Sequence, residues 1–350
     1  MKSGNKIWST IVDYFLILGA IIGVGFASGK EIYEFFFKFE GASILGLLAF
    51  GLLYIYLFFV IQHINRKLNL KSYSEFNQAV FGRFCKISNI VMIINFTITC
   101  AGMLAGADYI FETFFNIGFK IPSIVLSVIT FVVLLGGIKK VKIMSNFIIP
   151  IMIAIIVINS IGNTTPQNVN LEISVHNGIM AVYYSILFGV NNFVAALPVL
   201  FETKLKSKGK LVVILTICLI ILLNILVFAS NNFSTDMPMF ELSSNVAPMF
   251  YYIYFTALIM ALFSTLMICT FNIQKILFKA NKSKFYLALI VIFNLILSNV
   301  GYGNIVKYFY VVSGIISGIY VALLSILIVV KLLRIKRKKQ INSLKNNKNI

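Results

Sequence analysis

The chain has 350 residues, of which 59% are apolar and 12% are charged, and its mean hydropathy is +0.94. A soluble domain has roughly 45–50% apolar and about 25% charged residues, so this composition excludes a soluble enzyme and a disordered protein and indicates a membrane protein. The net charge of +19 would suggest nucleic-acid binding in a soluble chain. In a membrane chain it first reflects orientation, and we expect no nucleic-acid partner.

Apolar segments long enough to cross a bilayer recur along the whole chain. A spanning helix needs roughly 20 apolar residues, and the segments must be helical because lipid offers the backbone no hydrogen-bond partners. We expect ten spans, near 8–38, 42–62, 87–109, 121–137, 146–161, 178–201, 211–230, 248–271, 285–300 and 305–331. The sequence therefore predicts an all-α integral membrane protein with ten transmembrane helices.

The first span is interrupted by glycine. It reads DYFLILGAIIGVGFASGKEIYEFF, with glycines at 19, 23, 25 and 29. Each glycine costs a helix about 1 kcal/mol, so this cluster predicts unwinding near the middle of the membrane. The alternative is close helix packing, because Gly19 and Gly23 form a small-xxx-small face.

The segment 63–86 is polar, and we expect it to form a surface helix or an ordered loop on the cytoplasmic side. Span three then carries Asn95, Thr97 and Thr99 within an apolar run. One or two of these side chains are expected to face a pathway, and interhelical hydrogen bonds are the alternative.

The sixth span, YYSILFGVNNFVAALPVLFE, is also expected to be unwound. Gly189, Asn191, Asn192 and Pro198 interrupt its apolar run. Two asparagines at this depth are costly unless they meet water, a ligand or free backbone groups.

Orientation follows from the basic residues. With a cytoplasmic N-terminus, 26 of the 30 Lys and Arg residues fall on the cytoplasmic side, which is a strong positive-inside signal. Both termini are therefore predicted to be cytoplasmic. The basic tail, residues 332–350, is expected to lie along anionic lipid headgroups.

The two interrupted spans hold matching positions in the chain. Spans one to five and six to ten form two halves, and an odd number of crossings inverts the second half. We therefore predict a first five-helix repeat at 1–161 and an inverted second repeat at 162–331. Broken helices at matching positions of inverted repeats point to a transporter site at the midplane.

The motif GAIIGVGFASGKE in the first span resembles that of the YkvI-like bacterial membrane proteins. The segment AGMLAGAD in span three and the aromatic–Asn stretch in span six are weaker matches. These proteins belong with the amino acid–polyamine–organocation superfamily, so the resemblance implies a LeuT-like fold in a bacterial inner membrane. Lys30 departs from the neutral Gln that we expect at its position.

The predicted substrate niche lies where the interrupted spans meet. Free amide groups at an unwound helix end attract a carboxylate. The niche is expected to contain Gly23, Gly25, Phe26, Ala27, Ser28, Phe188, Asn191 and Asn192.

A sodium site is predicted between spans one and eight. In ALFSTLM, spacings of three and four place the Ala261 carbonyl near the hydroxyls of Ser264 and Thr265, and such oxygens suit a hard cation. The resemblance implies the carbonyls of Gly19 and Ile22 as further ligands. The alternative is that both hydroxyls bond back to their own helix.

Three charged residues are candidates for gates or proton transfer. Asp13 lies near the cytoplasmic side, where it can pair with a basic loop residue, carry a proton, or simply pair with Lys6. Lys30 and Asp108 are expected to form an extracellular gate, unless Lys30 pairs with Glu34 one helical turn away.

These patterns favour a secondary active transporter of a small solute, an amino acid or related zwitterion, coupled to a cation with Na⁺ preferred. The alternatives are a proton-coupled permease or exporter of the same fold, and a transporter-like receptor that binds a solute without moving it. We expect no enzyme activity and no cofactor apart from the coupling ion, and the sequence leaves the oligomeric state open.

Overall fold

The computed structural model describes residues 2–115, 120–164, 174–232, 235–277 and 283–346, and these form helices without any strand. The first part of the chain contains α1 (Lys2–Ile21), α2 (Val24–Ser28), α3 (Lys30–Phe35), a 3-10 helix (Phe37–Ala42), α4 (Ser43–Leu68), α5 (Tyr73–Phe81), a 3-10 turn (Gly82–Phe84), α6 (Cys85–Phe115), α7 (Ile121–Leu134) and α8 (Gly137–Asn163). The rest contains α9 (Val175–Leu200), α10 (Ser207–Ser230), α11 (Pro238–Glu241), α12 (Ser243–Val246), α13 (Pro248–Leu277), α14 (Ser283–Leu297), a 3-10 turn (Ser298–Val300), α15 (Tyr302–Asn304), a π-helix (Ile305–Phe309) and α16 (Tyr310–Asn346).

Seven helical stretches among the described residues are long and apolar enough to cross a membrane, and each overlaps a predicted span. They are Phe37–Leu68, Tyr73–Phe115, Gly137–Asn163, Val175–Leu200, Ser207–Ser230, Pro248–Leu277 and Tyr302–Arg334. Three shorter apolar helices, Trp8–Ile21, Ile121–Leu134 and Phe285–Val300, coincide with the other predicted spans. The protein is therefore a multi-pass helical membrane protein, while the total of ten spans and the inverted repeats at 1–161 and 162–331 stay predictions.

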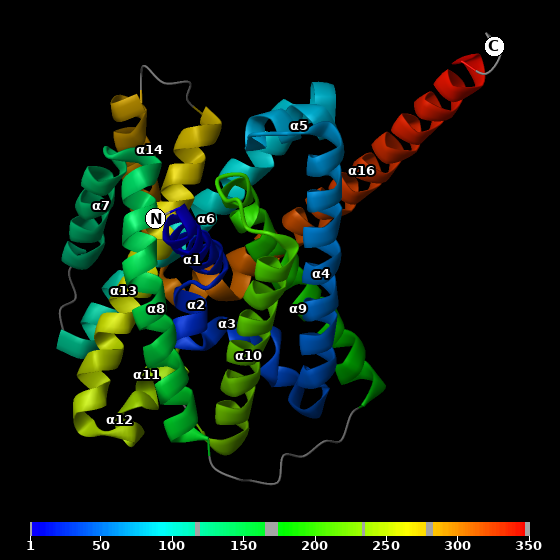
Figure 1. The fold of residues 1–350 in the computed structure, drawn as a ribbon. Coiled ribbons are helices and arrows are strands. Elements are labelled where there is room, and N and C mark those ends of the chain that lie inside the picture. Colours follow the sequence, from blue (N-terminus) through cyan, green and yellow to red (C-terminus); the bar gives the residue numbers. More distant parts are fainter. Residues whose placement is uncertain (1, 116–119, 165–173, 233–234, 278–282, 347–350) are drawn as a thin grey trace.

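The long helices pack into two groups with the first span between them. In one group α4 packs against α9 and α10, and both α9 and α10 contact α1. In the other, α13 packs against α6, and α7 and α14 contact both. Helix α8 contacts α1 and α13, and α16 contacts α9 and α6, so these two helices join the groups. Figure 1 shows the short helices α2 and α3 in the middle of the bundle.

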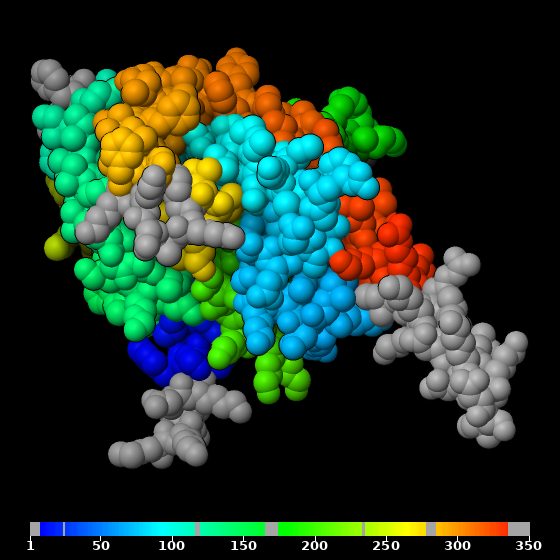
Figure 2. All heavy atoms as spheres, turned by 90° about the horizontal axis from the view of Figure 1, so that it is seen from above, coloured from blue at the N-terminus to red at the C-terminus, as the bar shows by residue number. Residues whose placement is uncertain are grey.

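The predicted cytoplasmic face is the one seen from above in Figure 2. The segment after α4 forms a helix there, as expected: α5 begins after Ser72, whose side chain accepts a hydrogen bond from the Glu75 backbone. Glu75 accepts in turn from the Lys71 amide, so both side chains cap the helix start. Helix α16 runs past the bundle (Figure 1), and the end of the predicted basic tail, 347–350, lies outside the described residues.

The contact between α4 and α9 depends on a glycine. A Cβ atom at Gly46 would lie 3.0 Å from the Ala181 carbonyl oxygen, a backbone atom of the facing helix that cannot rotate away. At Gly51, on the same helix, a Cβ atom would meet only the Cys218 sulfur, at an ordinary 3.5 Å. Small residues let membrane helices approach closely, so position 46 sets this helix–helix distance.

We expect Gly46→Ala to lower the thermal unfolding temperature in detergent relative to Gly51→Ala. Both changes gain up to about 1 kcal/mol of helix propensity, but only the change at position 46 pushes two backbones apart. Equal unfolding temperatures for the two variants would contradict the packing described here.

Candidate functional site

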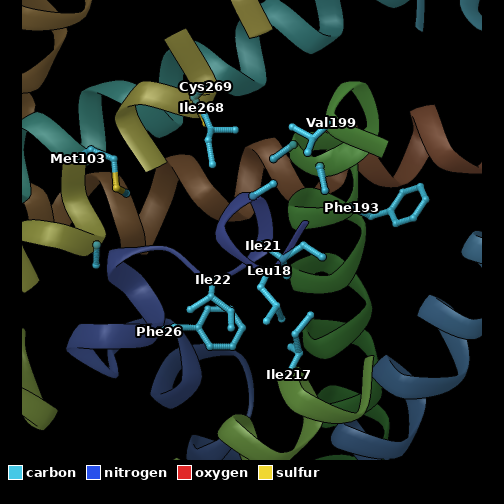
Figure 3. Packing of buried hydrophobic residues seen from close by; sticks show 14 of the residues in the cluster. Leu18, Ile21, Ile22, Phe26, Met103, Phe193, Val199, Ile217, Ile268 and Cys269 are labelled. Carbon is cyan, nitrogen blue, oxygen red and sulfur yellow. The ribbon is translucent and has the colours of Figure 1, made fainter. Parts of the chain in front are cut away.

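The first span is interrupted in the middle of the bundle, as the glycines predict. Helix α1 ends at Ile21, Ile22 and Gly23 are not helical, and α2 follows. A second turn occurs at Gly29, whose φ of 79° is a conformation that favours glycine. In Figure 3, Ile21, Ile22 and Phe26 lie between two sets of helices. Helices α9 and α10 lie on one side, and the helices that carry Met103 and Ile268, α6 and α13, lie on the other.

The sixth span is not unwound, and that prediction is wrong. Helix α9 runs without a break from Val175 to Leu200. Gly189 fits against α4, where an added Cβ would lie 2.9 Å from Leu53. Asn191 Oδ1 accepts a hydrogen bond from Asn95 of α6, and Asn192 donates to the Phe188 carbonyl one turn back. Each asparagine thus makes a hydrogen bond, with a neighbouring helix or within its own helix, without opening the backbone.

A small enclosed cavity lies at the break in span one. Its volume is about 20 Å³, which is room for about one water molecule. Helices from both groups line it, through Ala20, Ile21, Gly23, Glu31, Thr99, Met103, Asn191, Asn192, Ala195, Thr265, Cys269 and Tyr310. A solute the size of an amino acid cannot enter it in this conformation, so the site is closed.

Three residues of the predicted niche, Gly23, Asn191 and Asn192, line this cavity, and the others lie around it. Phe26 and Phe188 pack with their ring centroids 5.4 Å apart in a buried aromatic cluster. The Ala27 carbonyl accepts a hydrogen bond from Tyr254. These residues are therefore packed in the interior and do not line the cavity.

Ser28 and Gly25 also have structural partners. The Ser28 hydroxyl lies 2.9 Å from Tyr302 Oη and bonds weakly back to the Gly25 carbonyl. A Cβ atom at position 25 would lie 1.8 Å from Cδ of Glu31. Gly25 is therefore the surface on which the Glu31 carboxyl group rests.

Glu31 is the main cavity residue that the sequence analysis missed. Its side chain is 5% exposed, and the described residues give its carboxylate neither a hydrogen bond nor an ion pair. Adjacent Lys30 points elsewhere, to Asp236 at 2.8 Å and to Glu34 at 3.6 Å. In the sequence, Glu31 follows Lys30 at the end of a span, and such a charged pair is typical of a position at the membrane surface. Only the turn at Gly29 brings Glu31 back against Gly25.

The predicted sodium residues are partly brought together. Helix α13 packs against α1 and α2. The Ser264 hydroxyl donates to the Ala261 carbonyl of its own helix, which is the alternative considered for it. Thr265 Oγ1 is buried without a hydrogen-bond partner and faces Gly23, where an added Cβ would lie 3.0 Å from it. Gly19 packs against Ile149 and Ile268.

Asp13 is held in a cluster of charges at the predicted cytoplasmic end. Its carboxylate lies 3.2 Å from Lys142 Nζ and accepts a 2.8 Å hydrogen bond from the Lys204 amide. Lys142 also donates to the Glu202 carbonyl, and the Glu202 side chain pairs with Lys275. The cluster ties α1 to α8, to the end of α9 and to α13. Asp13 thus pairs with basic residues near the membrane surface, as one of the alternatives stated.

The expected Lys30–Asp108 gate is wrong. Lys30 pairs with Asp236 in the segment before α11, whereas Asp108 pairs with Lys120 at 3.0 Å and accepts from the Ser123 amide at the start of α7. Helix α3 directs Lys30 toward the α10–α11 connection, and the free amides of a helix start compete for Asp108. An ion pair still holds the predicted outer end of span one, but the acid is Asp236 and not Asp108.

An open pocket of about 520 Å³ lies next to that ion pair, at the predicted outer end. It lies between the end of α6 and the segment from Thr235 to Tyr252, and its lining includes Tyr109, Phe240 and Tyr251. The Asp236 amide donates to Tyr109 Oη, and the rings of Tyr109 and Tyr302 are 6.0 Å apart. A series of side-chain contacts, from Tyr109 to Tyr302 and from Tyr302 to Ser28, thus links this outer pocket to the break.

Comparison with known proteins agrees with a membrane protein of this fold. No family model matches the chain. The uncharacterized membrane protein YkvI of Bacillus subtilis is 27% identical over 318 residues, which covers 87% of this chain and 91% of that protein. The uncharacterized protein YyaD of the same organism is 25% identical over 140 residues, 40% of each chain.

A solved structure shares the fold. It is Mhp1, a nucleobase-cation-symport-1 family transporter, in a closed conformation with bromovinylhydantoin bound. The TM-score is 0.55 at 11% identity, and the match covers 86% of this chain and 73% of Mhp1. The chain is thus a membrane protein with the fold of a known transporter.

Proposed function

We propose that the protein is a secondary active transporter of a small solute, driven by a coupled cation, with Na⁺ preferred. The single observation that supports this most is the closed cavity at the interrupted first span, lined from both helix groups. A binding site between two groups of helices can open to either side when one group moves against the other. The fold shared with Mhp1, itself described as a cation-symport family member, supports the same mechanism.

An amino acid or related zwitterion is the proposed substrate class. Span six supplies no half-helix N-terminus, because α9 is continuous, so the support now comes from the cavity lining. Asn191, Asn192 and Thr99 offer amide and hydroxyl groups. Such groups both donate and accept hydrogen bonds, and so suit the carboxylate and the ammonium group of one small molecule.

Two sets of ion pairs are the proposed gates. The Asp13–Lys142 cluster joins α1 to α8 and α13 at the predicted cytoplasmic end, and Lys30–Asp236 joins α3 to the α10–α11 connection at the outer end. Each set joins parts of the bundle that must separate for the cavity to open. The outer pocket is the proposed entrance, since its volume lies in the range of roughly 300–1,000 Å³ usual for small-molecule sites.

A proton-coupled version that uses Asp13 is less well supported, because Asp13 is engaged by Lys142 and the Lys204 amide. We retain an exporter or a non-transporting receptor of the same fold as alternatives that uptake assays distinguish. The inner-membrane location and cytoplasmic termini are part of this proposal and rest on the distribution of Lys and Arg.

We expect proteoliposomes containing the protein to accumulate one or more labelled amino acids when an inward sodium gradient is imposed, and empty liposomes not to do so. Asn192→Ala should lower uptake about twofold to tenfold, because one hydrogen bond contributes about 0.5–1.5 kcal/mol. Asn224→Ala is the matched control: Asn224 also bonds back to its own helix but lies in α10 and does not line the cavity. Equal loss in both variants, or binding without accumulation, contradicts transport through this site.

The inner gate can be tested with Cys269, which lines the cavity and is 2% exposed. In a chain whose other cysteines are replaced, Asp13→Asn should make Cys269 react about fivefold faster with an impermeant thiol reagent in inside-out vesicles. The reason is that loss of one charge-assisted contact favours opening by about 1 kcal/mol. Glu112→Gln, which changes an exposed acid in α6, is the control. An unchanged rate in Asp13→Asn would falsify this gate.

A further inference from the structure

The central cavity contains an acidic side chain without a positive partner. Glu31 lines it, is 5% exposed, and has no hydrogen bond or ion pair within the described part of the chain. The nearest lysine in sequence, Lys30, is held by Asp236 and Glu34. A charged carboxylate without a partner in a membrane interior is unfavourable by many kcal/mol, so Glu31 must either carry a proton or meet a cation.

The cavity also contains polar oxygen atoms without partners. Thr265 Oγ1 and Tyr310 Oη are both buried and lack hydrogen bonds. In addition, α1 ends at Ile21 beside the cavity, and the C-terminal end of a helix is the negative end of its dipole. The charge, the hydroxyl oxygens and the helix dipole all favour a positive occupant.

The available volume narrows the choice of occupant. About 20 Å³ admits a single water-sized particle, which is too small for an ammonium-bearing solute. The carboxylate of Glu31 and the hydroxyl groups of Thr265 and Tyr310 are oxygen ligands, which suit a hard cation. The sulfur atoms of Met103 and Cys269 also line the cavity but do not suit such an ion. The other titratable groups that face this region are Tyr302, Tyr310 and Cys269, none of which brings a positive charge.

We propose that Glu31 is the anionic ligand of a small monovalent cation, Na⁺, bound in the central cavity with Thr265. The inference rests on the proposed transport function and specifies its coupling site. It shares Thr265 with the sodium site expected from sequence, and it adds a charged ligand from α3. Gly25 is a positioning residue in this arrangement, because any side chain there would occupy the place of the carboxylate.

The test is thermal unfolding of the purified protein in sodium, potassium or choline chloride at equal ionic strength. The wild type should show a saturable sodium-specific increase in unfolding temperature, because a ligand that binds only the folded state stabilises it. Glu31→Gln should lose this increase, and its unfolding temperature in choline should equal or exceed that of the wild type, since an uncompensated buried charge has been removed.

Matched variants distinguish the position of the Glu31 carboxylate from the mere loss of one acidic group on α3. Glu34→Gln makes the same change three residues along α3, in an acid that pairs with Lys30 and Lys38, and should keep the sodium effect. Gly25→Ala retains Glu31 but displaces its carboxylate, and should lose the effect. If Gly25→Ala does not fold, Glu31→Asp provides the second variant, with a weakened sodium response.

Several outcomes overturn the proposal. The first is a wild-type protein whose unfolding temperature does not respond to sodium, and the second is a Glu31→Gln variant that keeps the sodium response. The third is an unfolding temperature that depends on pH instead of sodium and loses this pH dependence in Glu31→Gln, which identifies a proton site. The transport function is judged separately: proton-driven, sodium-independent uptake retains the function and rejects the sodium site. Sodium binding without uptake of any solute retains the site and rejects the function.

Discussion

The structure depends on an interrupted backbone in a place where lipid cannot satisfy it. Between Ile21 and Val24 the first span leaves its helix in the middle of the bundle, and every polar group freed there needs a partner from the protein. Helix α13 supplies one such partner, because Tyr254 donates to the Ala27 carbonyl, and it packs against the break where Thr265 faces Gly23. Tyr302 holds Ser28 on the side toward α15. The break is therefore supported mainly by one helix group while α1 itself packs on the other.

Because the break lies between the two helix groups, three features depend on how those groups are positioned. They are the cavity, the aromatic cluster of Phe26 and Phe188, and the ion pairs at the two ends. In the proposed transport cycle, movement between the groups slides the break against α13 and so changes the shape of the cavity. The Phe188 ring of α9 packs against Phe26 and also against Phe35 and Phe36, so it joins the region after the break to α9. The ion pairs Lys30–Asp236 and Asp13–Lys142 lie at opposite ends of the bundle, and in the proposed function they act as its gates.

Sequence patterns predicted the features of the fold that depend on residues close together in the chain. The length of apolar runs located the spans, and four clustered glycines identified the break in the first one, because both signals act within a few turns of helix. The same logic failed at Gly189 and Asn191, since a helix containing them survives when Leu53 fills the space beside the glycine and Asn95 satisfies the amide. The partner of Lys30 was also beyond local reasoning. Spacing along a helix indicates Glu34, but Asp236 comes from a distant connection whose path only the tertiary structure defines.

The contact between Gly25 and Glu31 has a consequence for how related sequences diverge. The missing side chain at position 25 and the carboxylate at position 31 fill the same volume, so neither residue can be judged alone. A lineage that replaces the acid with a small neutral residue becomes free to acquire alanine or serine at position 25, whereas one that keeps the acid must keep the glycine. The two positions are therefore expected to vary together among related sequences, because the space at one depends on the residue at the other.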